Sequence, residues 1–528
     1  MFSSGYTPWL AAAGSAPGPW PFAVLAICVA LIVFLIAVVR VHAFLALVLV
    51  SITAGLLAAP GRLPGERPER VEFSGAPLQV KGPAGGRLEL APAPPETPPA
   101  SLVTNVTVRQ PPRRTVSRGI LAVNLTLEAL GATAGKIAVV IALASIIGMG
   151  LMESGAADKV VRRFLAFFGE KRAGGAILFS GYFLSIPIFF DTFFMLLLPL
   201  ARALALRTRT NYLLYVLAIG AGASVTHSLI IPHPGPLAMA DMLHIDPGLS
   251  IMVGLGVGLI PIALTWQVAK WICRRAEVPV REVPGSSLED LRKLMDKPEG
   301  ELPGFFASVA PVLLPILLIS AASVVKASPS WKAAWPSFTP VLLFVGDRNI
   351  ALLLGAALAL NLVMRQKGIS FRQLSPLLGP PLETAGMIIL ITSAGGAFGT
   401  MLRNAGVGDA VKAAAEGAPV NLIFLAWLVA AVIRVAQGSA TVSMMTAAAM
   451  MTPLLGAGLP YHPIYIFMAI GFGAMILSWM NDSGFWVVCK LSGLTEQETL
   501  KSWTVVATAN SVFGLLACLV LSKIFPGT

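Results

Sequence analysis

The fold is decided by two neighbouring stretches, Ser185-Ile-Pro-Ile-Phe-Phe-Asp191-Thr192 and Ser224-Val-Thr-His-Ser-Leu-Ile-Ile-Pro-His-Pro-Gly-Pro236. Each one interrupts a long apolar run with prolines and with polar or ionisable side chains. An ionisable group at the centre of a bilayer costs about 2.5–3.5 kcal/mol. Non-helical backbone survives at that depth only where protein or a water-filled cavity satisfies its polar groups. Two such breaks close together therefore predict a solute site inside a membrane.

The composition around these stretches is typical of a membrane protein. The chain has 528 residues, of which 56% are hydrophobic and 12% charged, and its mean hydropathy is +0.79. Many uncharged runs approach the roughly 18 residues that cross a bilayer. The net charge of +12 comes from Lys and Arg in short loops between apolar runs. This distribution is a topology signal, so we expect the lipid bilayer as a partner and no nucleic acid.

Composition also divides the chain into parts. We expect N-terminal transmembrane spans in residues 1–59 and an extramembrane insertion in residues 60–118. A first transmembrane repeat (119–273), a cytoplasmic linker (274–303) and a second transmembrane repeat (304–528) should follow. The insertion is rich in Pro and Gly with mixed charge, so it cannot bury much core. We interpret it as a solvated, mostly irregular loop with a short strand pair around Val71–Val80 and Arg87–Leu90.

Basic loops predict two re-entrant hairpins. The segment Gly174–Leu200 has Lys and Arg on both flanks, so it should begin and end on the cytoplasmic side, with its tip near Pro187–Asp191. In the second half, Asn421–Met451 would form the matching hairpin. Self-similarity between Ser154–Asp158 and Ala405–Asp409, beside loops of different charge, indicates that the two copies face opposite ways. The predicted fold is therefore an all-α polytopic membrane protein with inverted repeats and broken transmembrane helices, as in secondary transporters.

Four breaks in apolar runs should meet and supply the site. They contain small hydroxyls, amides, glycines and an acid or an imidazole. Free N–H groups at half-helix N-termini bind anions, so this mixture suits a small polyhydroxylated anion better than a bare cation. The candidate substrate-binding or coupling residues are Asp191, Thr192, Ser224, Thr226, His227, His233, Gly235, Arg434, Gln437, Gly438, Ser439, Thr441, Asn481, Asp482 and Ser483.

Several of these residues have more than one possible role. Asp191 is the first candidate for proton coupling, or else it caps the half-helix that follows it. His227 and His233 either contact the substrate or are simply hydrogen-bonded. Arg434 pairs with a substrate carboxylate, pairs with Asp191 or Asp482, or extends its head group to the interface. Asp482 binds solute or caps the next helix.

Enzyme signatures are missing from the sequence. It contains no HExxH, no Walker loop and no GxSxG, and its four cysteines have no metal-ligand spacing. We therefore expect no catalytic activity, no cofactor and no ATP-driven step. Coupling to an ion gradient is the expected energy source.

At these same stretches the sequence resembles the gluconate permease (GntP) family of the ion-transporter superfamily, from about Leu121 to the C-terminus. The matching runs are Glu153–Asp158, Gly169–Arg172, Ile186–Asp191, Ser224–His227, Pro232–Pro236, Arg434–Thr441, Asn481–Trp486 and Glu498–Trp503. The resemblance implies uptake of gluconate or a related sugar acid with H⁺ across the cytoplasmic membrane. It also implies a homodimer with a scaffold part and a moving, elevator-like transport part.

Three alternatives stay open at this point. The substrate could be another small carboxylate, such as D-serine, lactate or a dicarboxylate. The coupling ion could be Na⁺. In a different class, the protein could be a transporter-like sensor whose insertion, 60–118, contacts a partner.

Overall fold

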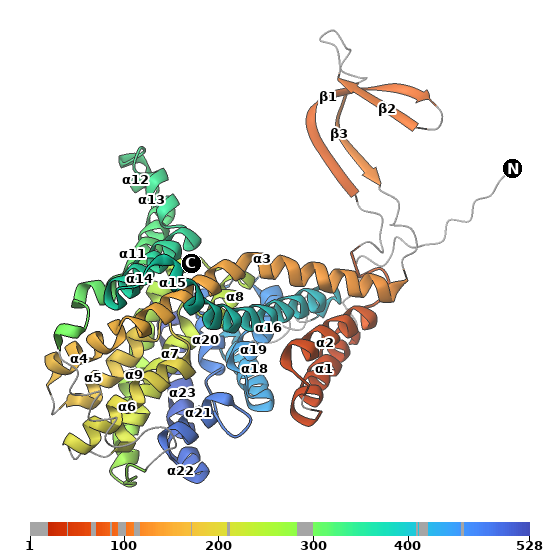
Figure 1. Ribbon diagram of the computed structural model, residues 1–528. Helices are drawn as coiled ribbons and strands as arrows, with labels where there is room; N and C mark the ends of the chain where they lie inside the picture. Colours follow the sequence, from red (N-terminus) through yellow and green to blue (C-terminus); the bar gives the residue numbers. More distant parts are fainter. Residues whose placement is uncertain are drawn as a thin grey trace.

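The apolar part of the chain is helical in the computed structural model (Figure 1). The structure describes residues 19–39, 41–64, 70–84, 87–92, 102–109, 117–169, 172–208, 212–281, 299–407, 410, 421–455 and 459–527. Within this part of the chain, seven helical segments are long and apolar enough to cross a membrane: Arg118–Glu153, Tyr212–Met242, Pro247–Cys273, Phe305–Ala327, Arg348–Lys367, Phe371–Asn404 and Glu496–Ile524. The predicted polytopic helical class is confirmed.

Two shorter helices precede the main body. α1 (Trp20–Val33) continues into the π-helical turn η2 (Phe34–Val38), and α2 (Ala43–Leu57) follows. The His42 ring nitrogen Nδ1 accepts a hydrogen bond from the Phe44 N–H, so it caps the start of α2. α2 packs against two long helices that follow it in the chain, one in each repeat. Arg40, which the sequence places in the turn between these helices, lies outside the described residues.

The insertion is more regular than the sequence predicted. Strands β1 (Arg70–Ala84), β2 (Arg87–Pro92) and β3 (Leu102–Arg109) form an antiparallel sheet in the order β2-β1-β3. The predicted pairing of the first two strands is confirmed, with Val80 opposite Leu90. The third strand was not predicted. Its run Leu-Val-Thr-Asn-Val-Thr-Val is rich in β-branched residues, which favour strands wherever a partner strand is present.

The first repeat contains one hairpin and one broken helix between two long helices. Its elements are α3 (Arg118–Glu153), α4 (Ala156–Phe168), α5 (Ala173–Leu184), α6 (Phe190–Thr208), α7 (Tyr212–Leu229), α8 (Pro234–Met242) and α9 (Pro247–Cys273). α5 ends just before Pro187, which has no N–H for a helical hydrogen bond. Pro232 and Pro234 break the helix between α7 and α8 in the same way.

Among the described residues, two membrane-length helices and five short ones lie between α9 and the long helix that follows them. They are η5 (Glu299–Glu301), α11 (Phe305–Ala327), α12 (Pro329–Ala334), α13 (Thr339–Val345), α14 (Arg348–Lys367), α15 (Phe371–Leu374) and η6 (Ser375–Leu378). α11 packs against α9 and α14, and α14 packs against α3. α14 ends at Gly368, whose φ of 63° is the left-handed conformation that glycine adopts without strain.

The later part of the predicted second repeat, from residue 379 on, follows the plan of the first repeat. Its elements are α16 (Gly379–Asn404), α18 (Leu422–Gln437), α19 (Ala440–Met451), η7 (Thr452–Leu454), α20 (Ile464–Gly473), α21 (Ser483–Ser492), α22 (Glu496–Lys501) and α23 (Trp503–Ile524). The α18–α19 hairpin corresponds to α5–α6, and the broken pair α20–α21 corresponds to α7–α8. Gly155 and Gly406, which the sequence aligned, both have positive φ, of 74° and 83°.

The repeats pack against each other element by element. α3 lies along α16, as Figure 1 shows, and α9 packs against α23. The half-helices cross over, because α8 of the first repeat packs on α19 of the second, and α21 packs on α6. All four breaks are thereby brought to the middle of the molecule.

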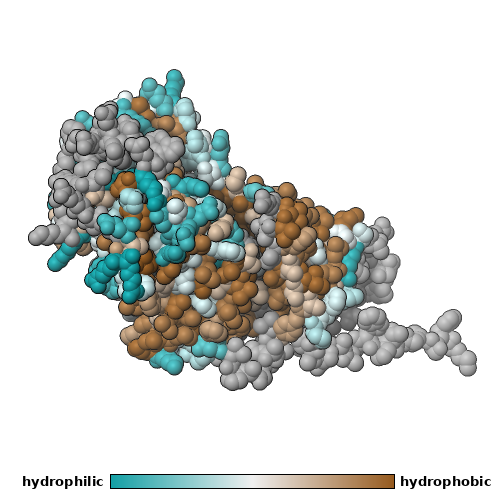
Figure 2. Space-filling view, turned by 90° about the horizontal axis from the view of Figure 1, so that it is seen from below, coloured by the Kyte–Doolittle hydropathy of each residue, from teal (hydrophilic) through white to brown (hydrophobic). Residues whose placement is uncertain are grey.

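Hydrophobic residues cover much of the outside of the helical body. Figure 2 shows them over most of the described surface seen from below, with hydrophilic residues gathered in patches. Large apolar side chains with about half of their surface exposed include Leu45, Leu127, Val139, Leu317, Leu353 and Val520, on α2, α3, α11, α14 and α23. Such a surface needs an apolar solvent, so the chain is an integral membrane protein.

Candidate functional site

The four breaks meet at one cavity of about 390 Å³. This volume lies within the range of small-molecule sites. Nine of the fifteen residues predicted from the sequence line it: Asp191, Thr192, Ser224, His227, Arg434, Ser439, Thr441, Asp482 and Ser483. Every break contributes at least one of them, so the two repeats build a single site.

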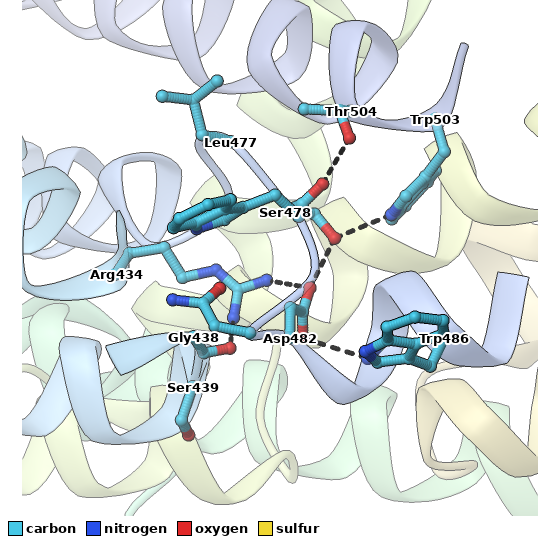
Figure 3. Close-up of polar contacts among 12 residues, drawn as sticks. Arg434, Gly438, Ser439, Leu477, Ser478, Asp482, Trp486, Trp503 and Thr504 are labelled. Carbon is cyan, nitrogen blue, oxygen red and sulfur yellow. Dashed lines mark hydrogen bonds and ion pairs between the residues drawn. The ribbon is translucent and has the colours of Figure 1, made fainter. Parts of the chain in front are cut away.

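A buried ion pair forms one wall of the cavity (Figure 3). Arg434, in the last turn of α18, donates from Nη2 to the Asp482 carboxylate and from Nη1 to the Gly438 carbonyl. The two side chains are only 6% and 9% exposed. Of the partners that the sequence left open for Arg434, the structure shows Asp482.

Asp482 is held from several directions. Its Oδ2 also accepts from the Ser478 hydroxyl, and its Oδ1 accepts from the Gly484 N–H at 2.9 Å, which caps α21. The Trp503 indole N–H donates to the Ser478 hydroxyl at 2.7 Å, and the Thr504 hydroxyl donates to the Ser478 carbonyl. Figure 3 shows this chain of contacts from α18 to the start of α23. Asp482 is therefore held in place by three hydrogen bonds.

Asp191 has the opposite environment. It lies in the first turn of α6, its side chain is exposed to the cavity, and its carboxylate makes no hydrogen bond or ion pair with any described residue. The neighbouring Phe190 ring lies 5.7 Å from the Trp503 ring, which closes the wall beside it. The capping bond that the sequence offered as an alternative role for Asp191 is not formed among the described residues. The carboxylate is left available to a ligand or a proton.

The N-terminus of α19 points free donors at the same cavity. Ser439 caps the helix by accepting from the Val442 N–H at 3.3 Å. The N–H groups of Ala440 and Thr441 have no partner among the described residues, and both residues line the cavity. Unpaired N–H groups at the positive end of a helix dipole form a binding site for an anion.

Two predicted residues of the first repeat support the wall instead of lining it. The Thr226 hydroxyl donates to the Tyr182 carbonyl at 2.7 Å, and His233 Nε2 lies 2.7 Å from the Ser185 carbonyl oxygen. Both contacts hold α7 and α8 against the end of α5, where the break leaves carbonyls without helical partners. The His233 ring lies 4.7 Å from that of His227, which does line the cavity.

The remaining predicted residues also lie outside the lining. Gly235 allows a methionine of α19 to pack against α8. Asn481 turns away and donates from Nδ2 to the Val435 carbonyl at 2.8 Å. Gly438 has a φ of 80° and joins α18 to α19, where its carbonyl accepts from Arg434. The side chain of Gln437 lies outside the described part of the structure.

Sequence reasoning missed part of the lining, chiefly Phe189, Phe190, Ser228, Thr384, Ile388, Met475, Ser478 and Trp503. Ser478 had a signal, because it aligns with Ser224 in the internal repeat and Ser224 lines the cavity. Thr384 and Ile388 had none, since they are ordinary residues on the uninterrupted helix α16.

Several known proteins resemble this chain over most of its length. The family model for the GntP family permease matches residues 120–524. The chain belongs to the GntP permease family. Its relatives include a gluconate permease of Pseudomonas aeruginosa, 34% identical over 402 residues, covering 75% of this chain and 87% of that protein. The low-affinity gluconate transporter of Escherichia coli (strain K12) is 30% identical over 507 residues, 94% of this chain and 97% of its own length.

Another relative extends the range of substrates in the family. The Gnt-II system L-idonate transporter of Escherichia coli (strain K12) is 29% identical over 398 residues, 75% of this chain and 88% of that protein. All of these relatives are transporters, so the GntP permease described here is a membrane transporter and not an enzyme.

The fold has a relative of known structure. The crystal structure of the YdaH transporter of Alcanivorax borkumensis, described as having an unusual topology, matches with a TM-score of 0.53. The match covers 97% of this chain and 98% of that protein at 14% sequence identity. The likeness confirms the predicted transporter fold.

Proposed function

We propose that this GntP permease imports gluconate or a related sugar acid together with protons across the cytoplasmic membrane. Its relatives include gluconate and L-idonate transporters. The observation that carries the proposal is the cavity where the repeats meet, because it combines donors for an anion, hydroxyl groups and one unpaired carboxylate.

The carboxylate of the substrate would bind at the N-terminus of α19. The N–H groups of Ala440 and Thr441 point there, and Arg434 adds positive charge from the neighbouring wall. Although two nitrogens of the Arg434 guanidinium are engaged, its buried Nε has no partner among the described residues. Because Nε is covered by protein, Arg434 would act on the substrate through its charge and not through a hydrogen bond from this atom.

The hydroxyl groups of a sugar acid need partners that both donate and accept. Thr441 and Ser483 offer such hydroxyls around the cavity, and His227 adds an imidazole. The Ser224 hydroxyl also lines the cavity, where it donates to the Ala221 carbonyl and accepts from Asn510. A site built to hydrogen-bond substrate hydroxyls rejects analogues that lack them, because its buried polar groups are then left unpaired. We therefore expect a polyhydroxylated acid to bind better than lactate or a dicarboxylate.

Asp191 would carry the coupling proton. An ionised Asp191 repels a carboxylate in the same cavity, so a proton on Asp191 and the anion in the site favour each other's binding. Protonation of Asp482 would cost more than protonation of Asp191, because the Asp482 charge compensates the buried Arg434. Substrate and proton would then enter together and leave together.

Uptake of radiolabelled gluconate into proteoliposomes tests the proposal. We expect accumulation driven by an inward proton gradient, without Na⁺, and competition by unlabelled sugar acids that exceeds competition by D-serine, lactate or dicarboxylates. A Na⁺ requirement at fixed pH, with no response to the proton gradient, would replace the proton. Saturable binding without uptake would instead support the sensor. The homodimer implied by the family resemblance stays a prediction, which the mass of the detergent-solubilised protein checks.

A further inference from the structure

A second cavity, of about 200 Å³, lies among α3, α8, α16 and α19. Its lining includes the charged side chains of Lys136, Asp241 and Arg403, together with His244 and the hydroxyl-bearing Thr133 and Thr400. No residue is shared with the lining of the substrate cavity. Its polar content therefore needs an explanation of its own.

The two cavities lie at opposite ends of shared helices. On α16, Thr384 lines the substrate cavity and Thr400 lines the second one. Sixteen residues separate them, which is about 24 Å along a helix. On α19 the corresponding residues are Thr441 and Ala449, about 12 Å apart. α8 and α19 thus stand between the cavities.

The barrier between the cavities is tightly packed. A side chain at Gly235 on α8 would overlap the end of Met444 on α19. A Cβ at Gly395 on α16 would come within 2.6 Å of the Met445 Cε. Methionine side chains adapt to changes in shape, so this contact can separate and reform without rebuilding a rigid core.

The charge of the second cavity favours an anion. The Arg403 guanidinium makes no hydrogen bond or ion pair with the described residues. Lys136 Nζ lies 3.0 Å from the Asp241 carboxylate, the acid in the described lining. Arg348 Nη2 donates to the Lys136 carbonyl at 3.1 Å and places another cation beside the cavity. Two basic side chains therefore stand against one acid in the described lining.

The distribution of basic loops predicts which side of the membrane this cavity faces. Arg365, Lys367 and Arg372 lie just before α16 begins, next to the substrate cavity end of that helix. The turn from Leu243 to Pro247, beside the second cavity, has no Lys or Arg. The positive-inside rule therefore predicts the extracytoplasmic side for the second cavity.

We propose that the second cavity is an anion antechamber, which binds the small carboxylate substrate on the extracytoplasmic side before α8 and α19 separate. The inference rests on the proposed function for the identity of its ligand. Arg403 and Lys136 would contact the carboxylate, and Asp241 would compete with it for Lys136. This competition keeps the binding weak, so the anion can move on to the main site.

Sided transport assays on the full-length protein test this assignment. Gluconate transport would be measured in right-side-out and in inside-out membrane vesicles for the wild type, Arg403→Gln, Arg403→Lys and Asp241→Asn. We expect Arg403→Gln to raise the KM from the extracytoplasmic side about three- to tenfold. Arg403→Lys should recover part of that loss. Asp241→Asn should lower the same KM, because Lys136 is released for the anion.

The two variants Arg403→Gln and Asp241→Asn should change the extracytoplasmic KM in opposite directions. A merely structural role of these residues would instead impair transport in both variants alike. The maximal rate, and the KM from the cytoplasmic side, should stay near wild type. Arg365→Gln is the matched control, because Arg365 lies at the end of α14 opposite to Arg348, away from the second cavity. It should leave both KM values unchanged. If wild-type vesicles carry gluconate but neither Arg403→Gln nor Asp241→Asn shifts the extracytoplasmic KM as stated, the antechamber is refuted. If the wild type carries no gluconate at all, the proposed function fails first.

Discussion

Two aspartates line the cavity where the four breaks meet, in very different surroundings. Asp482 accepts hydrogen bonds from Arg434, Ser478 and the Gly484 N–H, whereas the Asp191 carboxylate has no partner among the described residues. The first carboxylate is committed to compensating a buried cation, and the second is free to change its protonation state. In the proposed function, coupling and positioning are therefore divided between the two repeats.

Asp191→Asn tests the coupling role. The amide has nearly the same shape but cannot carry the coupling proton, so accumulation of gluconate against its gradient should be lost. Exchange of labelled for unlabelled gluconate at equal pH should persist in part, because it needs no net proton movement. Asp158→Asn is the matched control, since Asp158 pairs with Arg162 outside the cavity. Full uphill transport by the Asp191→Asn protein would remove this residue from the coupling step.

The buried pair predicts a loss of stability when it is broken. Asp482→Asn leaves the Arg434 charge uncompensated, at a cost of about 3–5 kcal/mol. Thermal unfolding of the purified protein in detergent should show a clearly lower midpoint. The double variant Arg434→Met with Asp482→Leu should recover much of the stability while transport stays absent. A wild-type midpoint for Asp482→Asn alone would contradict the role of the pair.

Single residues show how far sequence reasoning reached. The stretch around Asp191 and the motif around Asp482 were recognised because polar residues in apolar runs are costly and need a reason. The roles of Thr226 and His233 were not separable from those of lining residues, since only the packing of α7 on α5 turns them to backbone carbonyls. Trp503 reaches the site through a hydrogen bond to Ser478, which no local pattern reveals.

At the scale of elements, the tip of the hairpin α18–α19 would position the proposed anion site. Gly438 reverses the chain with a φ of 80° and lets the Asn481 backbone approach closely. The turn thereby sets where the free N–H groups of α19 point. A displacement of this tip should weaken substrate binding and lower the stability of the protein.

Gly438→Ala measures that constraint. The new methyl group would adopt a strained left-handed conformation and also overlap the Asn481 carbonyl oxygen. Gly368→Ala is the control, because Gly368 has a φ of 63° but no atom lies within 4 Å of the place that a Cβ would take. Backbone strain alone costs about 1–2 kcal/mol, so Gly368→Ala should lose no more than that. Gly438→Ala should lose more and raise the KM, as chemical denaturation and uptake assays would show; equal losses would contradict the steric role.

The breaks themselves were predictable because proline and glycine fix them locally. The sequence could not show which half-helix packs on which. The contacts of α8 with α19 and of α6 with α21 join segments more than 200 residues apart. The third strand of the insertion was likewise missed, since its pairing with β1 depends on a partner outside the local window.

At the scale of the whole molecule, the two repeats enclose the site from opposite orientations. The predicted orientation rests on basic loops, and it places the ends of α14 on different faces of the membrane. α14 has 20 residues, about 30 Å, which matches the apolar thickness of a bilayer. Lys332 on α12 and Arg372 on α15 mark the two ends, and both are exposed.

Single cysteines at these positions report sidedness. The background for this test is a protein whose four native cysteines have been replaced; three of them, Cys28, Cys489 and Cys518, are buried. In this background, Lys332→Cys should react with a membrane-impermeant maleimide added outside intact cells. Arg372→Cys should react only after the membrane is opened. Labelling of both from the same side would contradict the inverted arrangement.

The crossover of half-helices also affects how the protein is made. α5, α19, α20 and α21 have 10 to 12 residues each, too few to span a bilayer alone. α8 ends at Met242, and α19, which packs on it, begins at Ala440, 198 residues later. At 5–20 residues per second, the ribosome needs roughly 10–40 s to cover that distance. Throughout this interval the first half-site has no partner, so the nascent chain depends on the insertion machinery to shelter its polar residues from lipid until synthesis is nearly complete.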